Sequence, residues 1–180
     1  MEKEITKALK ILQDGGVILY PTDTIWGLGC DATNSEAIQK IYNIKQREES
    51  KSLITLVSDK NMLQTLTNHI PKIDTTSQPT TVIYQNVKGL SEILLARNGT
   101  AAIRIVQDEF CQKLIHSFGK AIVSTSANIS ETKSPKQFSD ITDDIINNAD
   151  YIVNLRKKER RENSSRIIKI EKNGSITKLR

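Results

Sequence analysis

The sequence predicts an α/β protein with a twisted, mixed, open sheet and helices packed on it. Short apolar runs typical of buried strands alternate with segments whose apolar residues recur at helical spacing. Near the end of the chain, two strand-like runs flank Asn173-Gly174, a dipeptide typical of hairpin turns, so the sheet is expected to finish antiparallel. The chain has the length of one domain, and we expect residues 1–180 to form a single domain.

Helices and strands alternate in the first half of the chain. A helical stripe over residues 5–12 stops at Gly15-Gly16, because glycine readily ends a helix. A second helix is expected to begin near Thr33, whose hydroxyl and Glu36 have the spacing of a capping box. Strands are predicted at 17–20, 53–57 and 80–84, and a further helix over 59–66.

The second half contains more strands than helices. Asp108 is a good N-cap for the helix that Phe110, Leu114 and Phe118 outline at helical spacing. Another helix is expected near residues 142–147. Strands are predicted at 101–106, 121–124, 151–153, 166–170 and 175–179.

Composition indicates a soluble globular protein. Apolar residues make up 37% and charged residues 26%, and no apolar run reaches the ~18 residues of a membrane span. The start, Met1-Glu2-Lys3-Glu4, lacks the basic region and apolar core of a signal peptide, so a cytoplasmic location is expected. Two cysteines are too few for a disulfide framework, and neither histidine has neighbours at metal-ligand spacing.

Most of the net charge of +5 comes from the segment Arg156 to Arg161, which holds five cations and one anion. Such a segment is either a solvated loop or a flap that reaches toward phosphates. Because the chain has one tryptophan, four tyrosines and three phenylalanines, few side chains are available to stack on bases. RNA binding, if present, is expected to be weak.

The first predicted strand runs directly into a polar loop. Thr22, Asp23 and Thr24 stand where the strand ends, which is the usual place for ligands in α/β sheets. Gly27 and Gly29 allow the backbone to approach a ligand closely. A tight turn with satisfied hydroxyls is the alternative. The glycine spacing matches neither a Walker loop nor a Rossmann fingerprint.

Cations gather behind the second helix. Lys45 continues its apolar stripe, and Arg47 and Lys51 follow closely. Because an unpaired buried ammonium is costly, Lys45 needs water or an anion, which indicates a cleft at this helix end; a solvated helix end is the alternative. Arg104 interrupts an apolar run suited to a central strand, so it lies either at an edge or in a pocket beside an anionic group.

Short polar residues follow another predicted strand. Ser124, Thr125, Ser126 and Asn128 offer hydroxyls and an amide that either cap a turn or hydrogen-bond an amino acid or nucleotide. No Ser-His-Asp or Cys-His arrangement can be assembled from the sequence. The residues alone therefore indicate a site for an anionic, phosphate-bearing ligand.

Four ordered motifs resemble the YrdC-like threonylcarbamoyl-adenylate synthases. They are Gly15 through Ala32, Ile44-Lys45-Gln46-Arg47, Ala102-Ile103-Arg104 and Thr125 through Ser130, and the closing Lys178-Leu179-Arg180 is similar as well. The resemblance implies a YrdC-like twisted open sheet with a positively charged concave face. It also implies the single-domain form, without the extra domain of the longer relatives.

The resemblance further implies a nucleotidyltransferase reaction, in which L-threonine, bicarbonate and ATP give threonylcarbamoyl-adenylate and pyrophosphate. Mg²⁺ would ride on the ATP oxygens, with few dedicated protein ligands. The product would pass to a tRNA threonylcarbamoyl transferase complex that modifies adenosine next to the anticodon. Such chemistry needs alignment and charge neutralisation rather than a protein nucleophile.

Site residues are implied position by position. Threonine would contact Thr24, Arg104, Ser126 and Ser165, with Arg104 on its carboxylate. Lys45 and Arg47 would be the catalytic cations and, with Lys51, would hold the phosphates. The nucleotide would lie against Arg47, Lys51, Ser124, Asn128, Ser134 and Arg180.

The chain departs from the family's pattern at several positions. Leu56 stands where some relatives have a substrate-binding histidine, Glu131 replaces a glycine, and Ser164 replaces a proline. Two rival functions stay open at this point: an RNA-binding module of the same fold, and a carbamoyl-transfer or hydrolase domain.

Overall fold

A computed structural model describes residues 1–49, 52–71, 73–75, 77–171 and 175–180. Its described strands form one mixed sheet in the order β7-β1-β2-β6-β3-β5-β4-β8-β9, which confirms the predicted α/β class. The pairs β1·β7, β3·β5 and β4·β8 are parallel and the other pairs are antiparallel. The strands are β1 Ile18–Tyr20, β2 Gly27–Gly29, β3 Ile54–Val57, β4 Thr80–Tyr84, β5 Ala101–Ile105, β6 Ile122–Ser126, β7 Tyr151–Ile152, β8 Arg166–Ile170 and β9 Ile176–Lys178.

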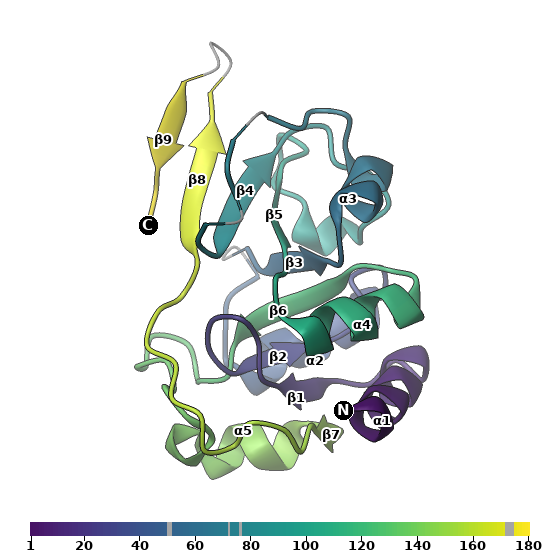
Figure 1. Cartoon of the computed structure of the whole chain (residues 1–180), viewed down its shortest axis with the longest axis vertical. Helices are drawn as coiled ribbons and strands as arrows, with labels where there is room; N and C mark the ends of the chain where they lie inside the picture. The colour runs from purple at the N-terminus through teal and green to yellow at the C-terminus, as the bar shows by residue number, and fades with distance from the viewer. Residues whose placement is uncertain (50–51, 72, 76, 172–174) are drawn as a thin grey trace.

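Helices cover both faces of the lower part of the sheet (Figure 1). They are α1 Glu2–Gln13, α2 Ser35–Ile44, α3 Lys60–Leu66, α4 Glu109–Phe118 and α5 Asp143–Asn148, with short 3₁₀ turns at Glu92–Leu94 and Phe138–Asp140. Residues 17–20 alternate between the two cores: Val17 and Leu19 join the cluster beneath α2, whereas Ile18 and Tyr20 join the cluster beneath α1 and α4. Burial on both faces explains why this strand is a continuous apolar run. None of the described helices is long and apolar enough to cross a membrane.

The start of α2 differs by one residue from the prediction. The Thr33 amide and hydroxyl both donate to Asp31 Oδ1, at 2.7 Å each, so this side chain closes a local turn. Asn34 is the cap instead, and its side chain accepts a hydrogen bond from the Ala37 amide at 3.1 Å. The predicted Thr33 cap is therefore wrong, because a nearer carboxylate competes for its hydroxyl.

Strand β2 was not predicted, and β6 runs two residues beyond its predicted end. Glycine is depleted in strands, so Gly27-Leu28-Gly29 has no strand signature in its composition. Backbone pairing of Gly27 with Ser126 nevertheless joins β2 to the end of β6. The polar residues Thr125 and Ser126 are thereby held in a central strand rather than in the turn that their composition indicates. The predicted turn at 173–174 lies outside the described residues, although β8 and β9 do pair antiparallel.

Gly29 allows two strands to approach closely, and we expect Gly29→Ala to destabilise the protein. An added Cβ would lie 2.7 Å from both the Tyr20 ring and the Val123 carbonyl oxygen. Overpacking of this kind costs about 1–3 kcal/mol, which lowers the melting temperature by roughly 2–12 °C in a chain of this size. Thermal unfolding measures it, with the exposed Ser117→Ala as the control; equal melting temperatures would contradict the close packing.

Candidate ligand site

A cavity of about 180 Å³ lies where the β1–β2 loop, the end of β6, strand β5 and the segment before β8 meet. Its wall is rich in hydroxyl-bearing residues and has three arginines, but none of its described lining residues is an aspartate or glutamate. The polar lining residues are Thr22, Thr24, Ser52, Ser124, Thr125, Ser126, Ser134, Ser164 and Ser165 with Arg47, Arg104 and Arg180. These residues come from segments far apart in the chain, so the fold brings together most of the predicted site residues.

The loop after β1 presents one hydroxyl with free acceptor capacity. Thr22 Oγ1 donates to the Ile25 carbonyl at 2.8 Å and accepts from the Thr24 amide at 3.1 Å. The two threonine oxygens lie 2.9 Å apart, and since the Thr22 hydrogen is already used, the Thr24 hydroxyl must donate to Thr22. Thr24 therefore offers lone pairs to a donor in the cavity, such as an amine. The loop is both a satisfied tight turn and part of a cavity wall.

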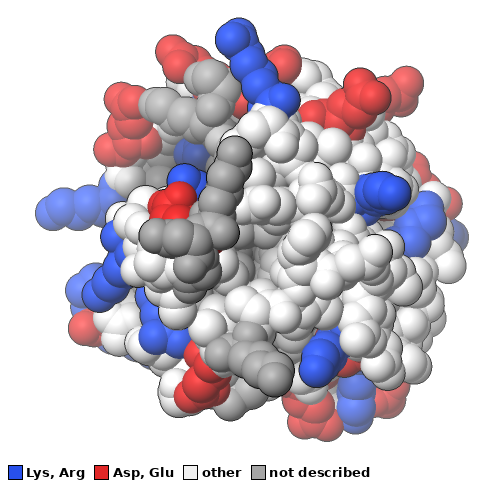
Figure 2. Space-filling model, turned by 90° about the horizontal axis from the view of Figure 1, so that it is seen from above, with Lys and Arg blue, Asp and Glu red and all other residues white. Residues whose placement is uncertain are grey.

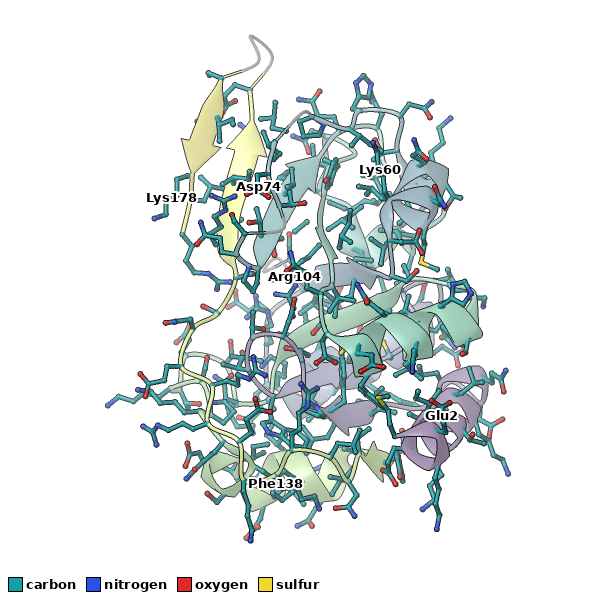
Figure 3. The ribbon with its side chains drawn as sticks, in the orientation of Figure 1. Glu2, Lys60, Asp74, Arg104, Phe138 and Lys178 are labelled. Atoms are coloured by element: carbon teal, nitrogen blue, oxygen red, sulfur yellow. The ribbon has the colours of Figure 1, made fainter. Side chains whose placement is uncertain are left out.

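Arg104 lies in a pocket rather than at a sheet edge, because β5 stands between β3 and β4. Its Nη2 donates to Asp23 Oδ1 at 3.0 Å, and the two side chains are only 4% and 8% exposed. Asp23 Oδ2 accepts a further bond from the Gln107 amide. Arg104 Nε is buried and has no hydrogen-bond partner among the described residues. Figure 3 shows this side chain near the middle of the molecule, between β8 and the lower half of the sheet. Because a guanidinium has five N–H donors and Arg104 lines the cavity, the bond to Asp23 leaves donors for a second anionic partner.

Arg180 stands on the same cavity wall. Its Nε donates to the Ser165 carbonyl at 3.1 Å, and its Nη2 lies 3.4 Å from Ser165 Oγ. The Ser165 hydroxyl also lies 2.8 Å from the Thr81 hydroxyl, so Ser165 is fixed from two sides. Burial and the charge of Arg104 lower the pKa of Arg180. Two guanidinium groups that repel one another favour an anion between them.

The two cations behind α2 point in different directions. Gln46 adopts a left-handed backbone conformation, with φ 49°. Arg47 follows it, lines the cavity and donates to the Ser52 carbonyl at 3.2 Å. Lys45 precedes it and is 1% exposed, and its Nζ donates to the carbonyl oxygens of Ser126 and Asn128 at 2.5 and 2.6 Å. Lys45 does not line the cavity. Lys51 lies outside the described residues.

The loop after β6 brings Ser134 to the cavity but turns Asn128 away from it. Asn128 Nδ2 donates to the carbonyls of Ile129 and Thr132, at 2.9 and 2.8 Å, so this amide holds its own loop. Glu131 has φ 68°, a left-handed conformation that glycine adopts more easily than other residues. The glycine that the family pattern shows at this position is therefore explained by the backbone.

The basic segment is attached to the protein beside the cavity. Arg156 pairs with Asp108 at 2.5 Å and donates to the Pro21 carbonyl, and Arg161 pairs with Glu159. Lys157 lies 4.5 Å from the centre of the Phe138 ring. These ion pairs partly neutralise the charge of this segment where it lies. Figure 2 looks down on the opposite, upper end of the molecule, where lysine, arginine and acidic side chains lie mainly around the outline.

Several lining residues were missed by the sequence analysis. Trp26, Ile54 and Ile167 form apolar parts of the wall, and the Trp26 ring packs 5.0 Å from that of Phe138. Ser164, noted only as a departure from the family, also lines the cavity. Leu56 does not line it and is fully buried beneath α1 and α4. The position of Trp26 just after the polar loop could have identified it as a lining residue. Ile167 could not be identified in this way, because β8 reaches the cavity only through its pairing with β4.

An open α/β sheet whose cavity combines strand-end hydroxyls with arginines is typical of domains suited to a small anionic molecule. No group of three or more His, Cys, Asp or Glu side chains that could hold a metal ion occurs among the described residues. A comparison with known families is more specific. The chain belongs to the Sua5/YciO/YrdC family, whose model, described as "Telomere recombination", matches residues 10–180.

Individual relatives agree with this assignment. The chain is 34% identical over 133 residues to a threonylcarbamoyl-AMP synthase of Photobacterium profundum, a match that covers 69% of this chain and 72% of the relative. The fold matches P. abyssi Sua5 complexed with L-threonine (TM-score 0.86, 23% identity) over 100% of this chain, which spans 54% of that one. It also matches E. coli YciO (TM-score 0.83, 22% identity), covering 100% of this chain and 89% of that one.

Proposed function

We propose that this chain is an L-threonylcarbamoyladenylate synthase, which forms threonylcarbamoyl-AMP and pyrophosphate from L-threonine, bicarbonate and ATP. The names of its relatives support the activity, and the L-threonine complex of P. abyssi Sua5 supports the amino-acid substrate. The observation in this structure that favours it most is Arg104, a guanidinium that lines the cavity and is held in place by a 3.0 Å bond from its Nη2 to Asp23. A guanidinium positioned in this way suits the carboxylate of an amino acid.

Threonine fits the wall that Arg104 and Thr24 form. The Arg104 guanidinium would bind the carboxylate, and the lone pairs of Thr24 Oγ1 would accept a hydrogen bond from the amino nitrogen. Ser126 and Ser165 would lie against the rest of the amino acid, since both line the same cavity. Asp23 holds Arg104 in place without itself lining this cavity, so the carboxylate of the substrate meets little like-charge repulsion.

The nucleotide would occupy the side of the site with Arg47, Ser124, Ser134 and Arg180. Asn128 would act indirectly by holding the loop after β6, and the proposed contact of Lys51 lies outside the described residues. Threonine and bicarbonate first give a carbamate with loss of water. A carbamate oxygen then attacks the α-phosphorus, a new P–O bond forms, and the bond to the β-phosphate breaks to release pyrophosphate. The arginines would neutralise the charge that develops on the phosphates, and positioning supplies the remaining acceleration.

Mg²⁺ would enter with ATP. Mg²⁺ commonly keeps several waters and binds mainly through substrate phosphates. An ion carried by the nucleotide therefore needs no cluster of carboxylates, and none occurs among the residues that the structure describes. The ion would neutralise the phosphates.

Transfer of the adenylyl group of ATP to the carbamate would make this chain a nucleotidyltransferase. The product would then leave for a tRNA threonylcarbamoyl transferase complex, which places the enzyme in tRNA modification. We further propose that residues 1–180 act as one domain.

Pyrophosphate release from ATP tests the proposed function. We expect release to require both L-threonine and bicarbonate, and radiolabel from bicarbonate to appear in an adenylate product. Omitting either substrate, or replacing threonine by alanine, serves as the control. Pyrophosphate release that ignores threonine would contradict the proposal. AMP formation from carbamoyl phosphate would favour the carbamoyl-transfer alternative instead.

A further inference from the structure

Lys45 joins the end of α2 to the loop that follows β6. Its Nζ donates to the carbonyl oxygens of Ser126 and Asn128, and its own carbonyl accepts from the Ser130 amide at 2.8 Å. Lys45 thus donates two hydrogen bonds and accepts one, and its three partners span residues 126–130. The Ser126 carbonyl also accepts from the Asn128 amide at 2.9 Å, so this loop is tightly wound around the ammonium.

The surroundings of Lys45 explain why a cation stands there. The two carbonyl oxygens point their negative ends at one place, and an N–H donor between them removes the repulsion between these dipoles. No salt bridge to Lys45 occurs among the described residues, so its hydrogen-bond partners are main-chain oxygens. Burial, together with the charge of Arg47, lowers the pKa of Lys45 to about 7. A neutral amine still has two N–H groups, which is enough for both carbonyls.

The left-handed turn at Gln46 separates the two cations of this motif. Lys45 points inward beneath the cavity wall, while Arg47 lines the cavity. Ser126, whose carbonyl Lys45 holds, is itself a lining residue. The position of Ser126 thus depends on a side chain that lies behind it.

We propose that Lys45 is a positioning residue for the amino-acid part of the site and not a phosphate ligand, because it fixes the main chain of Ser126 and Asn128 from behind. This inference rests on the proposed function, in which Ser126 contacts threonine. Of Lys45 and Arg47, only Arg47 would then bind the phosphates.

Binding measurements separate the two roles of a lysine at this position. In the full chain, we expect Lys45→Met to weaken the binding of L-threonine at least tenfold in calorimetry, and to leave the dissociation constant of pyrophosphate within about twofold. The opposite pattern, with pyrophosphate weakened and threonine unchanged, would overturn the proposal. Lys45→Gln keeps two N–H donors and should recover part of the threonine affinity. This variant also provides the test if Lys45→Met folds poorly.

The matched control is Lys40→Met. Lys40 lies on the same helix, is exposed, and its Nζ donates to the Gly15 carbonyl away from the cavity. Both dissociation constants should stay within twofold of those of the unchanged protein.

Hydrogen exchange measures the protection of the loop amides in the absence of any ligand. It therefore tests the positioning role of Lys45 independently of the proposed function. Amides 126–130 should exchange at least tenfold faster in Lys45→Met, and more slowly in Lys45→Gln than in Lys45→Met. Unchanged exchange would overturn the positioning role. If the unchanged protein binds no threonine while exchange accelerates as expected, the proposed function fails and the positioning of the loop stands.

Discussion

Arg104→Met is expected to abolish threonine binding and to lower the free energy of unfolding by about 3–5 kcal/mol. The substitution leaves the Asp23 carboxylate, 8% exposed, as a buried charge that has lost its ionic partner. For a chain of this length the loss corresponds to a melting temperature lower by roughly 6–20 °C. Thermal unfolding and threonine calorimetry measure the two effects on the same sample.

The double variant Arg104→Met/Asp23→Leu separates the two effects. Replacing both members of a buried ion pair by apolar residues is often neutral for stability, so most of the melting temperature should return. Threonine binding should not return, because the guanidinium is still missing.

Lys120→Met is the matched control for the ion pair. It breaks the 2.8 Å pair with Asp31, in which the lysine side chain is 52% exposed, and should cost no more than about 1 kcal/mol. A single Arg104→Met variant that binds threonine normally would refute the proposed carboxylate site.

Much of the fold follows from local patterns. The apolar run at 17–20 and the spacing from Phe110 to Phe118 both identify their elements, because each reflects burial that a single strand or helix already shows. Strand β2 fails this test. Gly27-Leu28-Gly29 is a strand only because β1 and β6 pair with it on either side, and its glycines permit the close approach. The pairing that makes this segment a strand depends on β1 and β6, so the sequence of residues 27–29 does not reveal it.

The sequence predicted which residue types form the site better than it predicted which side chains point into the cavity. Strand-end hydroxyls and Arg104 reach the cavity, since strand ends in open sheets meet at a common edge. The inward direction of Lys45 depends on one left-handed residue, Gln46, whose conformation the sequence does not reveal. The ion pair between Asp23 and Arg104 joins residues 81 positions apart, so it could not be identified before the fold was known.

Arg47→Ala is expected to lower kcat/KM for ATP by about a hundredfold, which is the ~3 kcal/mol scale of losing one preorganised charge contact. Arg47 lines the cavity and donates to the Ser52 carbonyl, so it is held where it can meet phosphates. Steady-state pyrophosphate release at varied ATP measures the effect.

Arg47→Lys keeps a charge but loses the planar fork of donors, so it should lie between the alanine variant and the unchanged protein. The exposed Arg97→Ala is the control and should leave kcat/KM unchanged. Threonine affinity should also be unchanged in Arg47→Ala, in contrast to Arg104→Met and Lys45→Met. If Arg47→Ala turned over ATP normally, the phosphates would have to bind elsewhere. If Arg47→Ala instead lost threonine affinity, the threonine and phosphate parts of the site would not be separate. The three cations are thus distinguished by which substrate each variant loses: the phosphates for Arg47, threonine with stability for Arg104, and threonine with loop protection for Lys45.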